Sequence, residues 1–254
     1  MINITDIEDE RIIEFKSLRD NLLNKRGIIL AESEKVVLKL LNSDKKIFKL
    51  FTTNEHFEKY QDLIVKKQCE VLISSKEVME QIVGFKLHHG IMATVERPKY
   101  ESLSNLDNKI LILNGLTSPE NVGTMIRNAA AFNVNSIIFD YKTCSPYLRR
   151  CVRVSMGNIF NVKVHLTQNL VDTINTLKEN GYTVYSTANE DGAIDLPGHK
   201  FEEKSCIIIG SEGHGIEQRV KENSSSIIRI PINDTVAHLN AACSSSIFLY
   251  NLVQ

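Results

Sequence analysis

Short apolar runs alternate with amphipathic stretches along the chain from about residue 109 onward. The apolar runs predict six strands, at residues 110–113, 136–140, 161–166, 183–186, 206–209 and 227–230. Apolar positions at helical spacing predict helices between most of them, at residues 121–132, 170–180 and 216–223. This alternation is typical of an α/β domain with a mainly parallel sheet and helices on both faces. The periodicity by itself predicts an open, doubly wound sheet.

The first hundred residues predict a second, smaller α/β unit. Helices are expected at residues 10–24, 34–41 and 55–67, and strands at residues 27–31, 47–52, 69–73 and 87–95. Ser33 and Ser74 are each expected to cap the helix that follows. Pro98 ends the pattern and a polar connector follows it, so we place the two domains at residues 1–99 and 107–254.

One predicted helix carries a candidate site on its polar face. Ser118 is a suitable N-cap, and Pro119 suits the first helical position. The apolar face consists of Val122, Met125, Ile126 and Ala129. Arg127 lies on the opposite face between Gly123 and Ala131, which leave room for a ligand to approach. A glycine costs a helix about 1 kcal/mol relative to alanine, which indicates a packing or binding reason for Gly123. A solvated surface arginine is the alternative, but the capped turn and the glycine favour a site.

Composition excludes several function classes. The chain has 31 acidic and 30 basic residues, so it has no overall basic field, and RNA contacts must come from local patches. The five cysteines never form a C-x-x-C pair, and the seven histidines show no metal-ligand spacing. We therefore expect no metal site, no disulfide framework and a cytoplasmic location. No apolar run reaches membrane-spanning length, so no membrane partner is expected.

One clustered basic stretch lies at residues 147–157. Arg149 and Arg153 share a helix face at i, i+4, and Arg150 lies alongside. A solvated helix face and a phosphate-contacting patch both fit this pattern. We interpret the three arginines as candidate RNA-binding residues.

A glycine-rich loop at residues 210–215 follows a predicted strand and precedes a predicted helix. Ligands of open α/β sheets bind at this carboxyl edge, and glycines let a ligand approach the backbone closely. The spacing G-x-x-G-x-G differs from the dinucleotide fingerprint, and no Gly-Lys-Ser/Thr follows for a phosphate loop. The loop therefore disfavours NAD and ATP as ligands. Thr187 ends another strand at the same edge and is a candidate border of the same pocket.

Three stretches taken in order resemble the three sequence motifs of the SpoU/TrmH family of RNA ribose 2′-O-methyltransferases. The first motif, Asn-x-Gly-x-x-x-Arg, is met by Asn121, Gly123 and Arg127. The second, Gly-x-Glu-x-x-Gly, is met by Gly210, Glu212 and Gly215. The third is met by Ile230, Pro231, Leu239 and Asn240. The segment Arg153-x-Ser155-x-Gly157 also matches a family segment, and the first 97 residues resemble the family's small RNA-binding substrate domain.

The resemblance implies a fold, a cofactor and partners. The fold would be a parallel sheet flanked by helices with a C-terminal trefoil knot, which periodicity does not predict. The cofactor would be S-adenosylmethionine, lined by Gly210, Ile230 and Leu239. The small residues of the C-terminal helix at residues 239–252 predict a tightly packed core helix. The resemblance adds a homodimer in which the active site is completed across the interface. The substrate would be structured RNA, and the additional N-terminal domain favours ribosomal over transfer RNA.

The resemblance also implies catalytic roles. A methyl sulfonium is already an activated electrophile, so the reaction needs no metal, only alignment and loss of the hydroxyl proton. Arg127 is often taken as the base in this family, but a guanidinium stays protonated in proteins. We expect Arg127 to hold the target phosphate and stabilise the developing alkoxide. Asn121 and Asn240 would orient Arg127 or the ribose by hydrogen bonds. Glu212 would lie in the site near Arg127.

Two positions depart from the family pattern. His238 stands where serine is usual, and Asp234 where glycine is usual. Histidine changes charge near neutral pH, so His238 is a candidate proton acceptor. The same departures motivate an alternative function, a non-catalytic RNA-binding or ribosome-assembly factor on the same fold. A nucleotide-binding oxidoreductase is disfavoured by the missing dinucleotide fingerprint.

Overall fold

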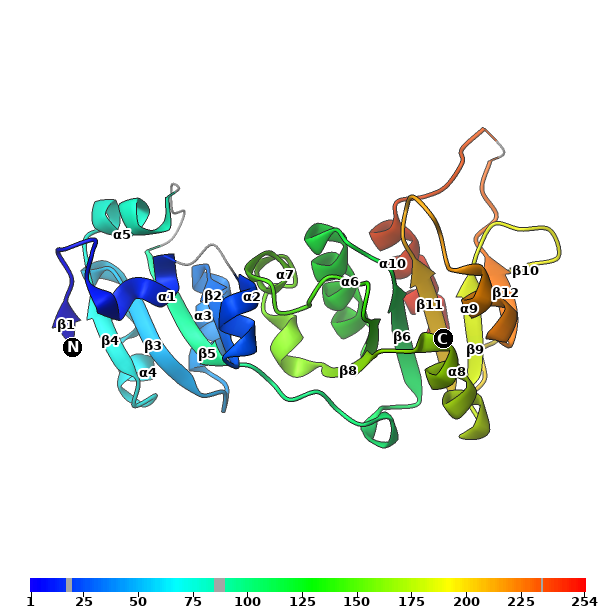
Figure 1. Cartoon of the computed structure of the whole chain (residues 1–254), viewed down its shortest axis with the longest axis horizontal. Coiled ribbons are helices and arrows are strands. Elements are labelled where there is room, and N and C mark those ends of the chain that lie inside the picture. Colours follow the sequence, from blue (N-terminus) through cyan, green and yellow to red (C-terminus); the bar gives the residue numbers. More distant parts are fainter. Residues whose placement is uncertain (17–19, 85–89, 234) are drawn as a thin grey trace. The chain divides into compact units, whose positions relative to one another are not determined.

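The computed structural model describes residues 1–16, 20–84, 90–233 and 235–254. The chain divides into two compact units, which are described separately (Figure 1). Unit 1 consists of residues 1–98 and 147–157, and unit 2 of residues 99–146 and 158–254. Residues 17–19 of the expected first helix, residues 87–89 of an expected strand, and Asp234 lie outside the described residues.

Unit 2 contains a seven-stranded sheet in which every pairing between the described strands is parallel. Its strands are β6 (Lys109–Asn114), β7 (Ser136–Asp140), β8 (Lys163–Thr167), β9 (Thr183–Thr187), β10 (Ile194–Asp195), β11 (Ser205–Gly210) and β12 (Ser226–Arg229). Their order in the sheet is β10-β12-β9-β11-β6-β7-β8. The parallel sheet and its six longer strands confirm the sequence prediction. The two-residue β10 was not predicted, because it is exposed and carries no apolar pattern.

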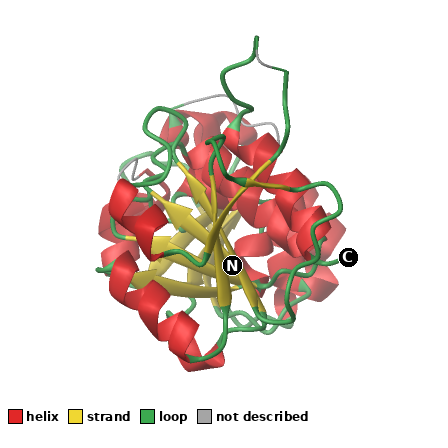
Figure 2. Ribbon diagram, turned by 90° about the vertical axis from the view of Figure 1, so that its right-hand side faces the viewer, coloured by secondary structure: helices red, strands yellow, loops and turns green. Residues whose placement is uncertain are grey.

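Helices cover both faces of this sheet (Figure 2). They are α6 (Pro119–Ala131), α8 (Leu170–Glu179), α9 (Gln218–Asn223) and α10 (Ala241–Leu252), with the short 3-10 helices η2 (Leu103–Asn105) and η3 (Asn158–Asn161). Helix α8 packs Leu170, Ile174 and Leu177 onto a cluster that includes the strand residues Ile110 and Ile208. Burial of such aliphatic side chains stabilises each by about 1.5–3 kcal/mol, so this apolar contact holds the layers together.

The C-terminal helix α10 packs against α6 and the central strand β11. Asn128 of α6 donates its amide to the carbonyl of Ala242 at 3.1 Å and to Ser245 Oγ at 3.4 Å. Ala242 and Ser245 are buried, as expected for small residues that allow close helix packing. The first turn of α10 is thereby placed beside α6, although about 115 residues separate the two in sequence. The trefoil knot stays a prediction.

Unit 1 contains a five-stranded mixed sheet in the order β1-β4-β3-β5-β2. Its strands are β1 (Ile2–Asn3), β2 (Ile28–Glu32), β3 (Ile47–Thr52), β4 (Glu70–Ile73) and β5 (Ile91–Glu96). Its helices are η1 (Glu10–Ile12), α1 (Ile13–Lys16), α2 (Asp20–Lys25), α3 (Glu34–Leu41), α4 (Asn54–Val65), α5 (Lys76–Val83) and α7 (Arg149–Val154). One continuous helix was expected at residues 10–24; the described part of that segment is instead divided among η1, α1 and α2.

The two predicted caps of unit 1 need correction. Ser75, not Ser74, caps α5, and its hydroxyl accepts from the backbone N–H of Val78 at 3.3 Å. The hydroxyl of Ser74 donates instead to the carbonyl of Ile4 at 2.6 Å, and this bond ties β1 to the end of β4. Ser33 occupies the cap position of α3 but makes no side-chain capping bond, because its φ of 83° is unlike the usual extended cap.

The start of α3 gives unit 1 a testable pH dependence. The Lys59 ammonium, which lies 2.8 Å from Glu34 Oε1, and the Tyr60 hydroxyl both donate to Glu34 and lower its pKa to about 2. A lowered folded-state pKa adds stability that is present above the ordinary value of 4.5 and is lost as the pH falls toward about 2. We expect the unfolding free energy, measured by urea titration from about pH 5 to pH 2, to fall less steeply in Glu34→Gln. Parallel slopes for the two proteins would contradict this prediction.

Among the described residues, no helix is long and apolar enough to cross a membrane.

Candidate active site

Residues from the three sequence motifs meet at the N-terminus of α10. Asn240 is its N-cap, and its Oδ1 accepts from the backbone N–H groups of Ala242 at 3.0 Å and Cys243 at 3.1 Å. Its Nδ2 donates to Asn121 Oδ1 at 3.3 Å and to the carboxylate of Glu212. Positions 121, 212 and 240 are therefore brought together by a single amide side chain.

The same contacts explain why each residue type suits its place. A carboxamide offers two donors and one acceptor oxygen, and Asn240 uses both kinds at once. Glu212 Oε1 also accepts the backbone N–H of Ala241 at 3.3 Å, so its negative charge lies at the positive end of the α10 dipole. Asn121 occupies the first turn of α6, which Ser118 caps through a 3.4 Å bond to the Asn121 N–H. We call Asn121, Glu212 and Asn240 the amide–carboxylate cluster.

The glycine-rich loop folds back on itself directly after β11. Ser211 and Gly215 exchange backbone hydrogen bonds of 3.2 and 2.8 Å. A Cβ on Gly210 would lie 2.4 Å from the carbonyl carbon of Gly215 and 2.5 Å from the N of Ile216. No side chain fits there, so Gly210 is required by the closed loop. The loop thus lies closed at the carboxyl edge of the sheet, where ligands of such sheets bind, and its residues 212–215 are exposed.

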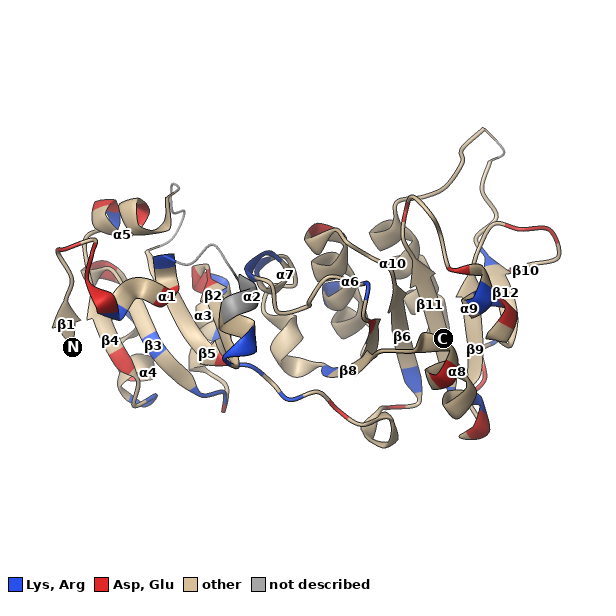
Figure 3. Ribbon diagram, viewed as in Figure 1, with Lys and Arg blue, Asp and Glu red and all other residues tan. Residues whose placement is uncertain are grey.

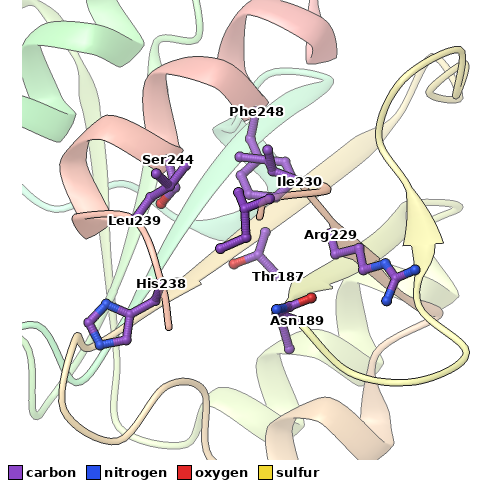
Figure 4. A pocket seen from close by; sticks show the side chains of 10 residues that line it. Thr187, Asn189, Arg229, Ile230, His238, Leu239, Ser244 and Phe248 are labelled. Carbon is purple, nitrogen blue, oxygen red and sulfur yellow. The ribbon is translucent and has the colours of Figure 1, made fainter. Parts of the chain in front are cut away.

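Two adjoining cavities open beside this loop. Figure 4 shows the side chains that line the smaller one. One holds about 130 Å³ and the other about 400 Å³. They share Thr187, Ala188, Asn189, His238, Leu239 and Ser244, and we call them together the cleft. All four predicted cofactor-binding residues line it: Thr187, Gly210, Ile230 and Leu239. Glu212 lines the larger cavity, so the amide–carboxylate cluster borders the cleft.

His238 lines both cavities and is exposed, with its ring beside the cleft in Figure 4. The part of the chain that the structure describes gives this ring no hydrogen-bond partner. The side chain is thus open to a ligand in the cleft.

The structure does not bring Arg127 into the amide–carboxylate cluster. The side chain is exposed, and it lines neither cavity of the cleft. Asn121 and Arg127 lie six residues apart on α6, which at about 100° per residue leaves them roughly 120° apart around the axis. Arg127 makes no ion pair with another residue that the structure describes. Its apolar neighbours Val122, Met125 and Ile126 are buried as predicted.

Sequence reasoning missed a buried carboxylate that supports the site. Asp140 ends β7 and accepts from Asn114 Nδ2 at 2.8 Å, from the Gly115 N–H at 3.1 Å, and from both the N–H and the hydroxyl of Thr143 at 2.8 and 2.6 Å. Several donors of this kind offset the cost of burying a charge. Asn114 Oδ1 in turn accepts the N–H of Glu217, the N-cap of α9. One carboxylate thus supports both the turn before α6 and the helix after the glycine loop. Its only sequence signal is its position at a strand end.

The predicted basic patch lies in unit 1, on α7 (Figure 3). Arg149 Nε lies 3.1 Å from one oxygen of Glu32, and Arg153 Nη1 lies 2.9 Å from the other. The Glu32 side chain is only 6% exposed, and the Arg149 side chain 14%. Two guanidinium groups therefore neutralise a buried carboxylate, which is a structural role that the sequence pattern did not reveal. Arg150 is exposed on the same helix.

Comparison with known proteins gives family matches for both units. The SpoU rRNA Methylase family model matches residues 108–250. A model described as RNA 2′-O ribose methyltransferase substrate binding matches residues 34–101.

Individual relatives cover most of the chain. An uncharacterised tRNA/rRNA methyltransferase of Mycobacterium tuberculosis is 27% identical over 98% of this chain and 90% of its own length. The 23S rRNA (guanosine-2′-O-)-methyltransferase RlmB of Vibrio vulnificus is 30% identical over 66% of this chain and 70% of its own. In fold, the chain is similar to an S-adenosylmethionine-bound rRNA methyltransferase of Sinorhizobium meliloti, with a TM-score of 0.87, 22% identity, and coverage of 99% of this chain and 97% of that one.

Proposed function

Because the chain belongs to the SpoU rRNA methylase family, we propose that it methylates ribosomal RNA and that residues of its own three motifs carry the reaction. The chain is an S-adenosylmethionine-dependent RNA methyltransferase that acts on a ribose 2′-hydroxyl. The observation that carries the residue assignment is the meeting of Asn121, Glu212 and Asn240 beside the cleft.

The residues that line the cleft fit the cofactor in their chemistry. Ile230, Leu239 and Phe248 offer apolar side chains for the adenosyl group. The loop at residues 210–215 lines the larger cavity, and its residues 212–215 are exposed to a ligand there. When bound, the cofactor supplies a methyl group that its sulfonium already activates. The protein must hold the ribose against it and assist loss of one proton.

Within the site we assign Asn121 and Asn240 to orienting the ribose, and Glu212 to holding Asn240 in place. Arg127 then holds the target phosphate and stabilises the negative charge that develops on the attacking oxygen. Its exposure and its distance around α6 from Asn121 favour a site completed by a second copy of the chain.

We therefore propose a homodimer, formed through α6 and α10. The exposed side chains at the end of α10 support this assignment, because Ile247 is 38%, Tyr250 53% and Val253 39% exposed. Large apolar side chains gathered on one helix are typical of an interface. We further propose the trefoil knot, supported by the return of α10 to α6 beside the central strand β11.

We propose an RNA role for unit 1 as well, in which the exposed Arg150 of α7 contacts RNA while Arg149 and Arg153 hold Glu32. The match of residues 34–101 to a substrate-binding family supports this assignment. The five free cysteines support a reducing, cytoplasmic location.

The proposed activity is tested by mapping 2′-O-methyl sites in total RNA from cells with and without the protein. We expect one ribosomal site to lose its methyl group when the protein is absent. A lost site in transfer RNA instead would overturn the substrate assignment but keep the reaction. An unchanged map, together with no S-adenosylmethionine binding by calorimetry, would favour the alternative of a non-catalytic RNA-binding factor.

His238 is assigned as the acceptor of the ribose proton, since its ring is exposed at the cleft and a neutral imidazole has one acceptor nitrogen. We expect the rate of the parent enzyme to fall toward acid pH, because a protonated imidazole accepts no proton. In His238→Ser this acid limb should disappear, and kcat should fall by about 10²-fold or more. A pH–rate profile of the same shape in both proteins would remove His238 from the mechanism.

A further inference from the structure

The cleft has three walls of different chemistry. One wall is apolar and includes Ile230 and Phe248. The second is the amide–carboxylate cluster, which reaches the cleft through Glu212. The third is an ion pair between Lys221 of α9 and Glu190, which follows β9; both residues line the larger cavity. The Lys221 side chain is 16% exposed and that of Glu190 is 39% exposed, so water reaches this wall only in part.

A sulfonium cofactor also has three substituents. Its adenosyl group has a flat, largely apolar ring, which suits the first wall. With the ribose held by Asn121 and Asn240 as proposed, the methyl group would be delivered on the side of the amide–carboxylate cluster. The remaining arm ends in an α-amino acid, which carries one carboxylate and one ammonium at neutral pH. Such a zwitterion is costly to bury unless both of its charges find partners.

We propose that Glu190 and Lys221 form the subsite that receives the amino-acid end of the cofactor. Lys221 takes the carboxylate and Glu190 takes the ammonium. The pair leaves donors and acceptors free for this, because an ammonium has three donors and a carboxylate about four lone-pair positions. The ligand carboxylate beside Lys221 and the ligand ammonium beside Glu190 would complete a ring of four charges, in which each charge has neighbours of opposite sign. This inference rests on the proposed function.

The other charged residues that line the cleft, among those the structure describes, are already engaged. The Glu212 carboxylate accepts from Asn240 and from the Ala241 N–H. Arg229 lines the smaller cavity but not the larger one, and its Nε donates to Asp195 at 2.7 Å. Glu190 and Lys221 are thus the oppositely charged pair that the larger cavity offers to a zwitterion.

Calorimetry with two ligands tests this subsite without measuring methyl transfer. S-Adenosylhomocysteine carries the amino-acid end, whereas 5′-methylthioadenosine lacks it. We expect Lys221→Met and Glu190→Gln each to weaken S-adenosylhomocysteine binding about tenfold, the loss of one charged hydrogen bond. Binding of 5′-methylthioadenosine should stay within about twofold of the parent. Glu190→Gln keeps the shape of the side chain, so it separates lost charge from lost packing.

Lys142→Met is the matched control, since Lys142 pairs with Glu217 at 2.8 Å and lines neither cavity. It should leave both affinities unchanged. An unchanged ratio of the two affinities in Lys221→Met and Glu190→Gln would overturn the subsite and leave the cofactor assignment intact. A parent protein that binds neither ligand would instead overturn the proposed function, and the subsite with it.

Discussion

We expect Arg127→Ala to abolish methyl transfer to RNA while S-adenosylmethionine stays bound. The guanidinium lines neither cavity of the cleft, so its removal leaves the cofactor contacts in place. Loss of one donor that stabilises a developing oxyanion costs about 10²–10³-fold in kcat. Loss of the phosphate contact weakens RNA binding in addition. The measurement is single-turnover transfer, with cofactor affinity determined by calorimetry on the same preparation.

Mixing two inactive variants tests whether Arg127 acts across a dimer. Arg127→Ala and Asn240→Ala are prepared separately and then allowed to exchange subunits. If the site takes Arg127 from one protomer and Asn240 from the other, each heterodimer has one intact site and activity returns. If both residues act within one protomer, both sites of the heterodimer stay defective. Transfer by Arg127→Ala at nearly the parent rate would refute the role of Arg127 altogether.

Gly210→Ala should lose cofactor binding. The new methyl group would lie 2.4–2.5 Å from backbone atoms of Gly215 and Ile216, which cannot turn away as a flexible side chain would. Relief requires opening the paired backbone bonds between Ser211 and Gly215. We expect the affinity for S-adenosylmethionine to fall at least tenfold, and the unfolding free energy to fall by about 1–3 kcal/mol, as for other overpacked sites. Calorimetry and urea unfolding measure the two effects.

The same loop provides the control for Gly210→Ala. A Cβ on Gly213 meets nothing within 4 Å, so Gly213→Ala adds a methyl group to open space. We expect it to bind the cofactor as the parent does. Equal losses in the two variants would mean that the loop responds to any added bulk, and the collision at Gly210 would not be the cause.

Local physical chemistry made much of this protein predictable from residue types alone. The period of apolar positions marked β7 over residues 136–140 and the buried face of α6. Ser118 and Pro119 predicted the start of α6. The Ser118 hydroxyl can accept from a free backbone N–H of the first turn, and Pro119 has no N–H that would need a partner there. The three sequence motifs predicted Asn121, Glu212 and Asn240 as residues of one site. Each of these signals depends on neighbours within a few residues or on the match of short segments to a family motif.

Contacts between distant segments decided the rest. The insertion of β11 between β6 and β9 reflects pairing of strands far apart in the chain, which no local period encodes. The same is true of Glu32, a buried carboxylate that pairs with Arg149 and Arg153 more than a hundred residues away in sequence. From the sequence pattern alone, these arginines were interpreted as RNA-binding residues. Asp140 was undetectable for the same reason, since its donors gather only once β6 and β7 lie side by side. The role of a buried side chain depends on the groups that surround it in the folded protein. Those groups come from distant parts of the chain, so only the tertiary structure identifies them.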